Sequence, residues 1–107
     1  MHKQGTRSPE HNALRKDGGT FIKALRNHAG LTQRDVSIAL NFKYYTMISQ
    51  IEAGSARCPP DCYEVLAETL GVDKALFAQK LMQFYDPHTY KAVWGTEKID
   101  MLDLFKK

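Results

Sequence analysis

Residues 31–54 predict two short helices joined by a turn, and this pattern constrains the fold of the chain more than any other. Thr32 is a residue type that caps helix starts, and Asp35 stands three residues later, where an acid completes a capping box. Asn41 can end the first helix, because asparagine tolerates the left-handed backbone found at helix ends. Gly54 can end the second helix for the same reason. Each helix should be about two to three turns long.

The second helix, expected over about residues 44–53, has one apolar and one polar side. Each residue advances about 100° around a helix, so Ile48 and Ile51 lie on one side, and Tyr44 falls with them. The first helix, expected over about residues 33–40, also has an apolar side. Two short helices, a tight turn and a polar outer face on the second helix are typical of the helix-turn-helix, whose second helix enters the DNA major groove.

The same region resembles the lambda-repressor/Cro-type group of helix-turn-helix regulators, often called the Xre family. The matching motifs are Leu31-Thr32-Gln33, Ile48-Ser49-Gln50-Ile51-Glu52-Ala53-Gly54 and Leu70-Gly71-Val72, preceded by Phe21-Ile22-x-x-Leu25-Arg26 and Gly30. They agree in order and approximate spacing over about residues 20–81. Asn41 replaces the usual glycine, and the turn is about one residue longer than usual, around residues 42–44. The resemblance implies an all-α, five-helix DNA-binding domain.

The residues that read DNA bases are assigned by counting back from Ile48, because the longer turn shifts the start of the second helix. Thr46, Ser49 and Gln50 fall opposite the buried isoleucines, toward the groove. Glutamine can pair with adenine, and serine and threonine can contact bases or phosphates. Tyr45 lies near the N-terminal end of this helix, where base contacts concentrate.

Phosphate contacts are expected from residues outside the polar face of the second helix. Arg34, Lys43 and Arg57 are the basic candidates, and they should supply affinity rather than sequence preference. The resemblance implies that Gln33 contacts a phosphate and also braces the second helix. Glu52 is expected to pair with a nearby arginine rather than to read a base.

The distribution of charge favours a duplex on the N-terminal side of the domain. The formal net charge of +3 is only mildly basic and does not by itself indicate nucleic acid. Basic residues are concentrated before Gly30, whereas residues 31–71 are net acidic. We therefore expect DNA to contact the basic N-terminal region together with the cations of the motif.

Three segments are expected along the chain. Residues 1–19 form a flexible basic arm, because Gly18-Gly19 would break a helix that begins before them. Residues 20–86 form the DNA-binding domain, and residues 87–107 form a C-terminal extension. Besides the two helices of the motif, helices are expected at about 20–28, at about 61–70 with Gly71 after it, and from Asp73 to a stop at Asp86-Pro87.

The extension carries more apolar side chains than a small monomer usually leaves exposed. They can be buried against the chain's own core, a second copy or another protein, and residues 97–105 can form a short amphipathic helix. We expect a homodimer whose interface contains Leu81, Phe84, Trp94, Met101, Leu102 and Phe105.

Two functions follow from the sequence. The first is a transcriptional regulator, a repressor that binds a palindromic operator in double-stranded DNA as a homodimer. The resemblance also implies an alternative, an antitoxin that binds a toxin protein through its C-terminal tail and represses its own operon.

Other classes of function are not expected. The sequence has no grouping of nucleophile, histidine and acid and no glycine-rich phosphate loop, so we expect no enzyme and no cofactor. Cys58 and Cys62 are expected to be small, partly buried residues rather than metal ligands. With no apolar run of about 20 residues and no secretory signal, we expect a cytoplasmic protein that does not enter membranes.

Overall fold

The computed structural model describes residues 9–106, which form only helices and connecting segments. The α-helices are α1 (Pro9–His28), α2 (Gln33–Ala39), α3 (Thr46–Ala53), α4 (Tyr63–Leu70), α5 (Lys74–Tyr85) and α6 (Pro87–Trp94), and two 3-10 helices are η1 (Pro60–Cys62) and η2 (Met101–Phe105). The absence of strands from residues 9–106 confirms the all-α fold class. Five helices were expected, and α6 is the additional one. Pro87 opens α6 instead of only ending α5, because a proline in the first helical turn loses no hydrogen bond.

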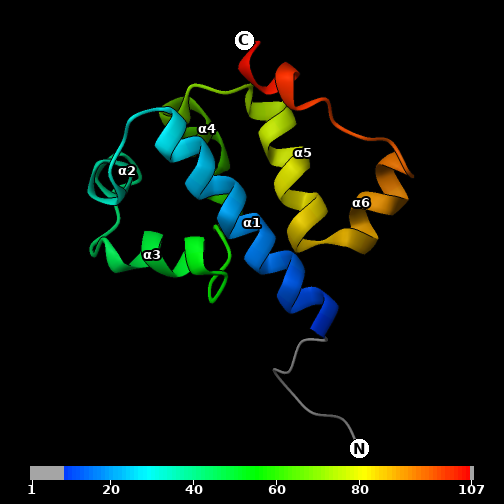
Figure 1. The fold of residues 1–107 in the computed structure, drawn as a ribbon, viewed down its shortest axis with the longest axis horizontal. Helices are drawn as coiled ribbons and strands as arrows, with labels where there is room; N and C mark the ends of the chain where they lie inside the picture. The colour runs from blue at the N-terminus through cyan, green and yellow to red at the C-terminus, as the bar shows by residue number, and fades with distance from the viewer. Residues whose placement is uncertain (1–8, 107) are drawn as a thin grey trace, which may run out of the picture.

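Helix α1 crosses the middle of the molecule, with α2 and α3 on one side and α5 and α6 on the other (Figure 1). The core contains apolar side chains from α1 to α5 and one from η2, led by the fully buried Phe77, Leu81 and Leu104. The chain therefore builds a single core around α1, against which the two short helices of residues 31–54 are held.

The helix ends expected at Thr32, Asn41, Gly54 and Gly71 are confirmed. The Thr32 hydroxyl accepts a hydrogen bond from the Asp35 N–H at 3.0 Å, and the Asp35 carboxylate accepts one from the Thr32 N–H at 2.8 Å. These bonds lower the pKa of the Asp35 carboxyl group. Asn41 (φ 58°), Gly54 (φ 84°) and Gly71 (φ 73°) all adopt the left-handed conformation that follows a helix.

The expected break at Gly18-Gly19 is wrong. Helix α1 continues from Pro9 to His28 through both glycines, so residues 9–19 are helical rather than a flexible arm, and residues 1–8 lie outside the described residues. The expected domain boundary after residue 19 falls inside this helix. A glycine costs about 1 kcal/mol of helix propensity, and burial of both glycines in tertiary contacts offsets that cost.

The two glycines let other helices approach the α1 backbone. A Cβ atom on Gly19 would overlap the carbonyl oxygen of Glu52 and would lie 2.6 Å from that of Ile51, both at the end of α3. On Gly18 a Cβ atom would lie 3.1 Å from the Cβ of Phe84 in α5. The contact is reciprocal, since a Cβ atom on Gly54 would lie 2.8 Å from the Cα of Lys16. Glycine is therefore used here for close packing of helices.

The C-terminal extension packs on the same core. Leu104 is fully buried, and its carbonyl oxygen accepts a hydrogen bond of 2.6 Å from the N–H of Asp73, at the start of α5. The Tyr90 hydroxyl donates to the Glu97 carbonyl oxygen at 2.6 Å, which closes the turn after α6. The helix expected over residues 97–105 is present only as the 3-10 helix η2.

No helix among residues 9–106 combines the length and the apolar character needed to span a bilayer.

Candidate DNA-binding interface

Helix α3 divides into a buried and an exposed side as expected. Ile48 and Ile51 are each 1% exposed, whereas Thr46, Ser49 and Gln50 are exposed. Helix α3 thus presents uncharged polar side chains to solvent along its length and is anchored to the core by its isoleucines.

The turn before α3 differs from the expectation. The helix starts at Thr46 and not near residue 44, and Tyr45 precedes it without a side-chain capping bond. Tyr44 was expected to point inward but is 63% exposed, because it lies in the turn and does not share the periodicity of the helix. Phe42 and Met47 pack against the core at this place instead.

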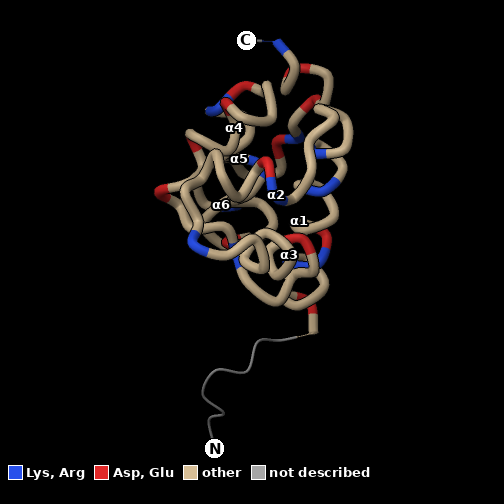
Figure 2. Tube along the Cα trace, turned by 90° about the vertical axis from the view of Figure 1, so that its left-hand side faces the viewer, with Lys and Arg blue, Asp and Glu red and all other residues tan. Residues whose placement is uncertain are grey.

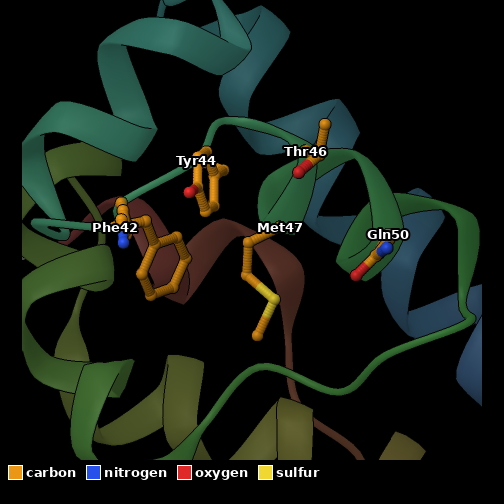
Figure 3. Close-up of a pocket in the computed structure, with 6 residues that line it drawn as sticks. Phe42, Tyr44, Thr46, Met47 and Gln50 are labelled. Carbon is orange, nitrogen blue, oxygen red and sulfur yellow. The ribbon is translucent and has the colours of Figure 1, made fainter.

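Two hollows flank this turn. One of about 360 Å³ is lined by Phe42, Lys43, Tyr44, Thr46, Met47 and Gln50. Figure 3 shows Phe42 and Tyr44 from the turn near Met47 in the first turn of α3, with Gln50 one turn further on. A second hollow of about 580 Å³ is lined by Arg34, Ser37, Ile38, Phe42, Lys43 and Tyr45. The structure thus brings six expected site residues, all but Ser49 in the walls of the hollows, around the start of α3.

A buried ion pair fixes α3 to α1 and α2. The Arg26 guanidinium donates to Glu52 through Nε at 2.6 Å and Nη2 at 3.0 Å, and its Nη1 donates to the Leu31 carbonyl oxygen at 2.8 Å. The bond with Glu52 raises the pKa of Arg26. Gln33 Nε2 donates to the same carboxylate at 3.0 Å. The expected pairing of Glu52 with an arginine is confirmed, and Gln33 braces α3 through Glu52.

Arg57 was expected to contact phosphate, but its guanidinium is engaged within the protein. Its Nη atoms lie 3.2 and 3.1 Å from the carboxylate oxygens of Asp86, and Nη2 donates to the Tyr63 hydroxyl at 3.0 Å. Its guanidinium also lies over the ring of Tyr85, 4.8 Å from the centroid. Burial disfavours the charged form, but the bonds with Asp86 and Tyr63 outweigh that effect and raise the pKa of Arg57. Arg57 therefore ties the loop after α3 to α5.

The basic residues of α1 do not form one patch. Arg26 is buried in its ion pair, and Arg15 lies over the Tyr85 ring at 5.9 Å. Lys16 and Lys23 are exposed. Figure 2 looks onto the side of the molecule that carries α2 and α3, and positions of both charge signs are interspersed there. The expected basic N-terminal face is therefore reduced to a few separate cations within residues 9–106.

The residues expected at a dimer interface separate into two groups. Leu81 is fully buried in the chain's own core, so its assignment to an interface is wrong. The sequence predicted an apolar side for α5 but could not show whether the core or a second copy covers that side. Phe84 is half-buried with its ring 5.6 Å from that of Phe21, and Trp94 is half-buried with its ring 5.1 Å from that of Tyr90. The exposed group comprises Met101, Leu102 and Phe105, and also Val93, which the sequence analysis did not single out.

The two cysteines differ in burial. Cys58 is fully buried, and burial raises the pKa of its thiol to about 12. Cys62 is half-buried at the end of η1. Within residues 9–106, no three His, Cys, Asp or Glu side chains converge as a metal site would require.

These features define a helix-turn-helix domain: two short helices joined by a turn, with uncharged polar side chains exposed on the second helix, which is fixed to α1 by the ion pair of Arg26 and Glu52. The profile of the helix-turn-helix domain family matches residues 19–79, more than half of the chain, and the protein belongs to this family. The match confirms the helix-turn-helix recognised from sequence and supports DNA binding, and it is consistent with the resemblance to Xre/Cro-type regulators. No curated protein and no solved structure matches the chain.

Proposed function

We propose that the protein is a sequence-specific transcriptional repressor that binds a palindromic operator as a homodimer, with α3 in the major groove. The observation that carries the proposal is the combination of a polar, exposed face on α3 with a rigid attachment of the opposite face. Thr46, Ser49 and Gln50 are exposed, while Glu52 on the same helix is held by Arg26 and Gln33. A helix that reads bases must present free side chains in a fixed position.

The residues around α3 divide into two roles. Thr46, Ser49 and Gln50 read base edges, with Tyr45 at the N-terminal edge of the helix. Three residues hold the phosphates. Arg34 on α2 and Lys43 in the turn are exposed cations, and Gln33 at the start of α2 adds a phosphate contact to its bond with Glu52.

Homodimerisation is proposed because one domain of this size covers only a few base pairs, and a second copy roughly doubles the contact. The segment 87–107 provides the surface: Met101 (42% exposed), Leu102 (72%) and Phe105 (43%) lie together in η2. Exposed apolar side chains so close together favour burial against another surface.

The test is binding of purified protein to a duplex selected from a random pool, followed by two substitutions on α3. Gln50→Ala and Thr46→Ala should each weaken binding to the selected duplex by about 1–3 kcal/mol and relax the preference at one or two positions. Thr89→Ala, an exposed position on α6, is the matched control and should bind as the unchanged protein does. Both α3 variants keeping full sequence preference would contradict the proposed role of α3.

An antitoxin is the second candidate, and the same exposed residues of η2 favour it. In that case the apolar surface binds a toxin protein, and the chain represses the operon that encodes both. The two candidates differ in what the protein does alone: the repressor is a dimer without a partner, whereas this antitoxin remains monomeric until the toxin is added. Sedimentation of the purified protein, with and without the product of a neighbouring short gene, separates them.

A further inference from the structure

The exposed face of α3 lacks the side chains that most often recognise guanine. Arginine and lysine pair with the O6 and N7 atoms of guanine in the commonest specific base contact. Helix α3, all of whose residues are described, contains neither, and Glu52 is its single charged residue. Because Glu52 is buried in the ion pair with Arg26, no charge on α3 faces the groove.

Gln50 is the residue on this face with the most base-specific chemistry. Its side chain lies on the exposed side, and its carboxamide makes no hydrogen bond to any other residue among 9–106. A free carboxamide offers one donor and one acceptor in the arrangement that matches N7 and the N6 amino group of adenine.

Apolar groups lie beside Gln50 and at the start of the helix. The ring of Tyr45 is 61% exposed, and Thr46 carries a methyl group on the exposed side. The adjoining hollow of about 360 Å³ includes the side chains of Phe42 and Met47 (Figure 3). Thymine alone among the DNA bases carries a methyl group in the major groove, and apolar side chains contact it.

The nearby cations are placed for the DNA backbone. Lys43 lines the same hollow as Gln50, but it belongs to the turn and not to α3, and its Nζ atom lies 5.4 Å from the ring centroid of Tyr44. Arg34 lines the second hollow, which does not include Gln50. Arg34 and Lys43 both lie outside α3, so every side chain that α3 itself exposes is uncharged.

We propose that α3 reads A·T base pairs directly in the major groove, with Gln50 paired to an adenine and with Tyr45 and Thr46 against thymine methyl groups. The operator half-site is then rich in A·T pairs where it faces α3. This inference rests on the proposed function and adds the class of sequence that is recognised.

The test begins with duplexes selected from a random pool and continues with base analogues at the selected A·T pairs. An inosine–cytosine pair keeps the minor groove of A·T but presents the major groove of G·C, and it should weaken binding by roughly 5- to 150-fold. A diaminopurine–thymine pair keeps the adenine pattern in the major groove and should bind as the selected duplex does. Uracil in place of thymine removes only the methyl group and should cost about 4-fold for each contacted base.

The outcomes separate this inference from the proposed function. Two results would overturn A·T reading in the major groove while leaving a DNA-binding regulator intact. One is a selected half-site that is rich in G·C pairs. The other is full binding of the inosine duplex together with loss of binding to the diaminopurine duplex. A pool that yields no enriched sequence would overturn the proposed function itself. Gln50→Arg should move the preference at one base pair from A·T to G·C. A purely structural role of Gln50 would not produce this change of specificity.

Discussion

Glu52 accepts hydrogen bonds from two helices at once, and this makes it the most consequential single residue for the position of α3. Arg26 reaches it from α1 and Gln33 from α2, and the side chains of the ion pair are only 10% and 4% exposed. A buried carboxylate without its partner is strongly destabilising, because the charge has no water to replace the lost bonds.

Arg26→Met should therefore lower the free energy of unfolding by about 3–5 kcal/mol, measured by chemical denaturation. The exposed pair of Lys74 and Glu64, 65% and 67% exposed, is the control, and Lys74→Met should leave stability nearly unchanged. If Arg26→Met is too unstable to purify, Gln33→Met removes only the second bond and should show a smaller loss with the same sign. Equal effects of Arg26→Met and Lys74→Met would contradict the importance of the buried pair.

Arg34 and Lys43 should act on DNA through charge alone. Replacing either with alanine should weaken binding to all duplexes alike and should reduce the slope of log affinity against log salt concentration by roughly one unit. Lys91→Ala, an exposed lysine on α6, is the control with the same change of charge. A variant that loses sequence preference while its salt slope stays unchanged would show that the cation reads bases.

At the scale of helices, the sequence predicted the elements whose ends depend on local rules. The capping box of Thr32 and Asp35 and the left-handed residues Asn41, Gly54 and Gly71 are each recognisable from a few adjacent residues. The isoleucine face of α3 was also predictable, because its period is a property of the helix itself. For the candidate site, exposure of Thr46, Ser49 and Gln50 followed from the same period.

The features that depend on tertiary contact could not be predicted in this way. The sequence alone cannot show that Gly18 and Gly19 lie against other helices, so their low helix propensity was taken as a break. The guanidinium of Arg57 is engaged by Asp86, 29 residues away. The insertion in the turn similarly hid the exposure of Tyr44.

The 3-10 helix η2 offers a direct test of how the C-terminal extension is used. Leu104 is fully buried, whereas Leu102, two residues earlier, is 72% exposed. At a concentration low enough for the protein to be monomeric, Leu104→Ala should lower the free energy of unfolding by about 2–5 kcal/mol, and Leu102→Ala should change it by no more than about 0.5 kcal/mol. Similar thermal melting of the two variants would show that the extension does not contribute to the core.

At the scale of the whole molecule, the buried side of the extension packs in the core and its exposed side is available to bind a second copy. The interior side, with Leu104, completes the core, so truncation after Asp86 should destabilise the domain instead of only separating two copies. From the sequence the extension was expected to form a dimer interface, and the burial of Leu104 adds a role in the chain's own core.

The dimer prediction is therefore tested on the full chain. Sedimentation at tens of micromolar should show a dimer, and Leu102→Asp should give a folded monomer because it places a charge on the exposed apolar surface. That monomer should bind a palindromic duplex much more weakly, because one dimer no longer occupies both half-sites of the duplex, which lie roughly 34 Å apart. Circular dichroism of the variant is the control for folding. A monomeric full-length protein that binds a palindrome no more tightly than a half-site would contradict the dimer.

The close contacts of α1 give its two neighbouring glycines unequal mutational tolerance. At Gly19 the obstacle is the Cβ atom itself, which meets backbone carbonyl groups of α3, so every other amino acid encounters it whatever its size or polarity. At Gly18 the nearest atoms belong to the side chains of Phe84 and Tyr85, which can shift by a few tenths of an ångström to admit alanine. A saturation library over α1 should accept only glycine at position 19, whereas position 18 should also accept alanine.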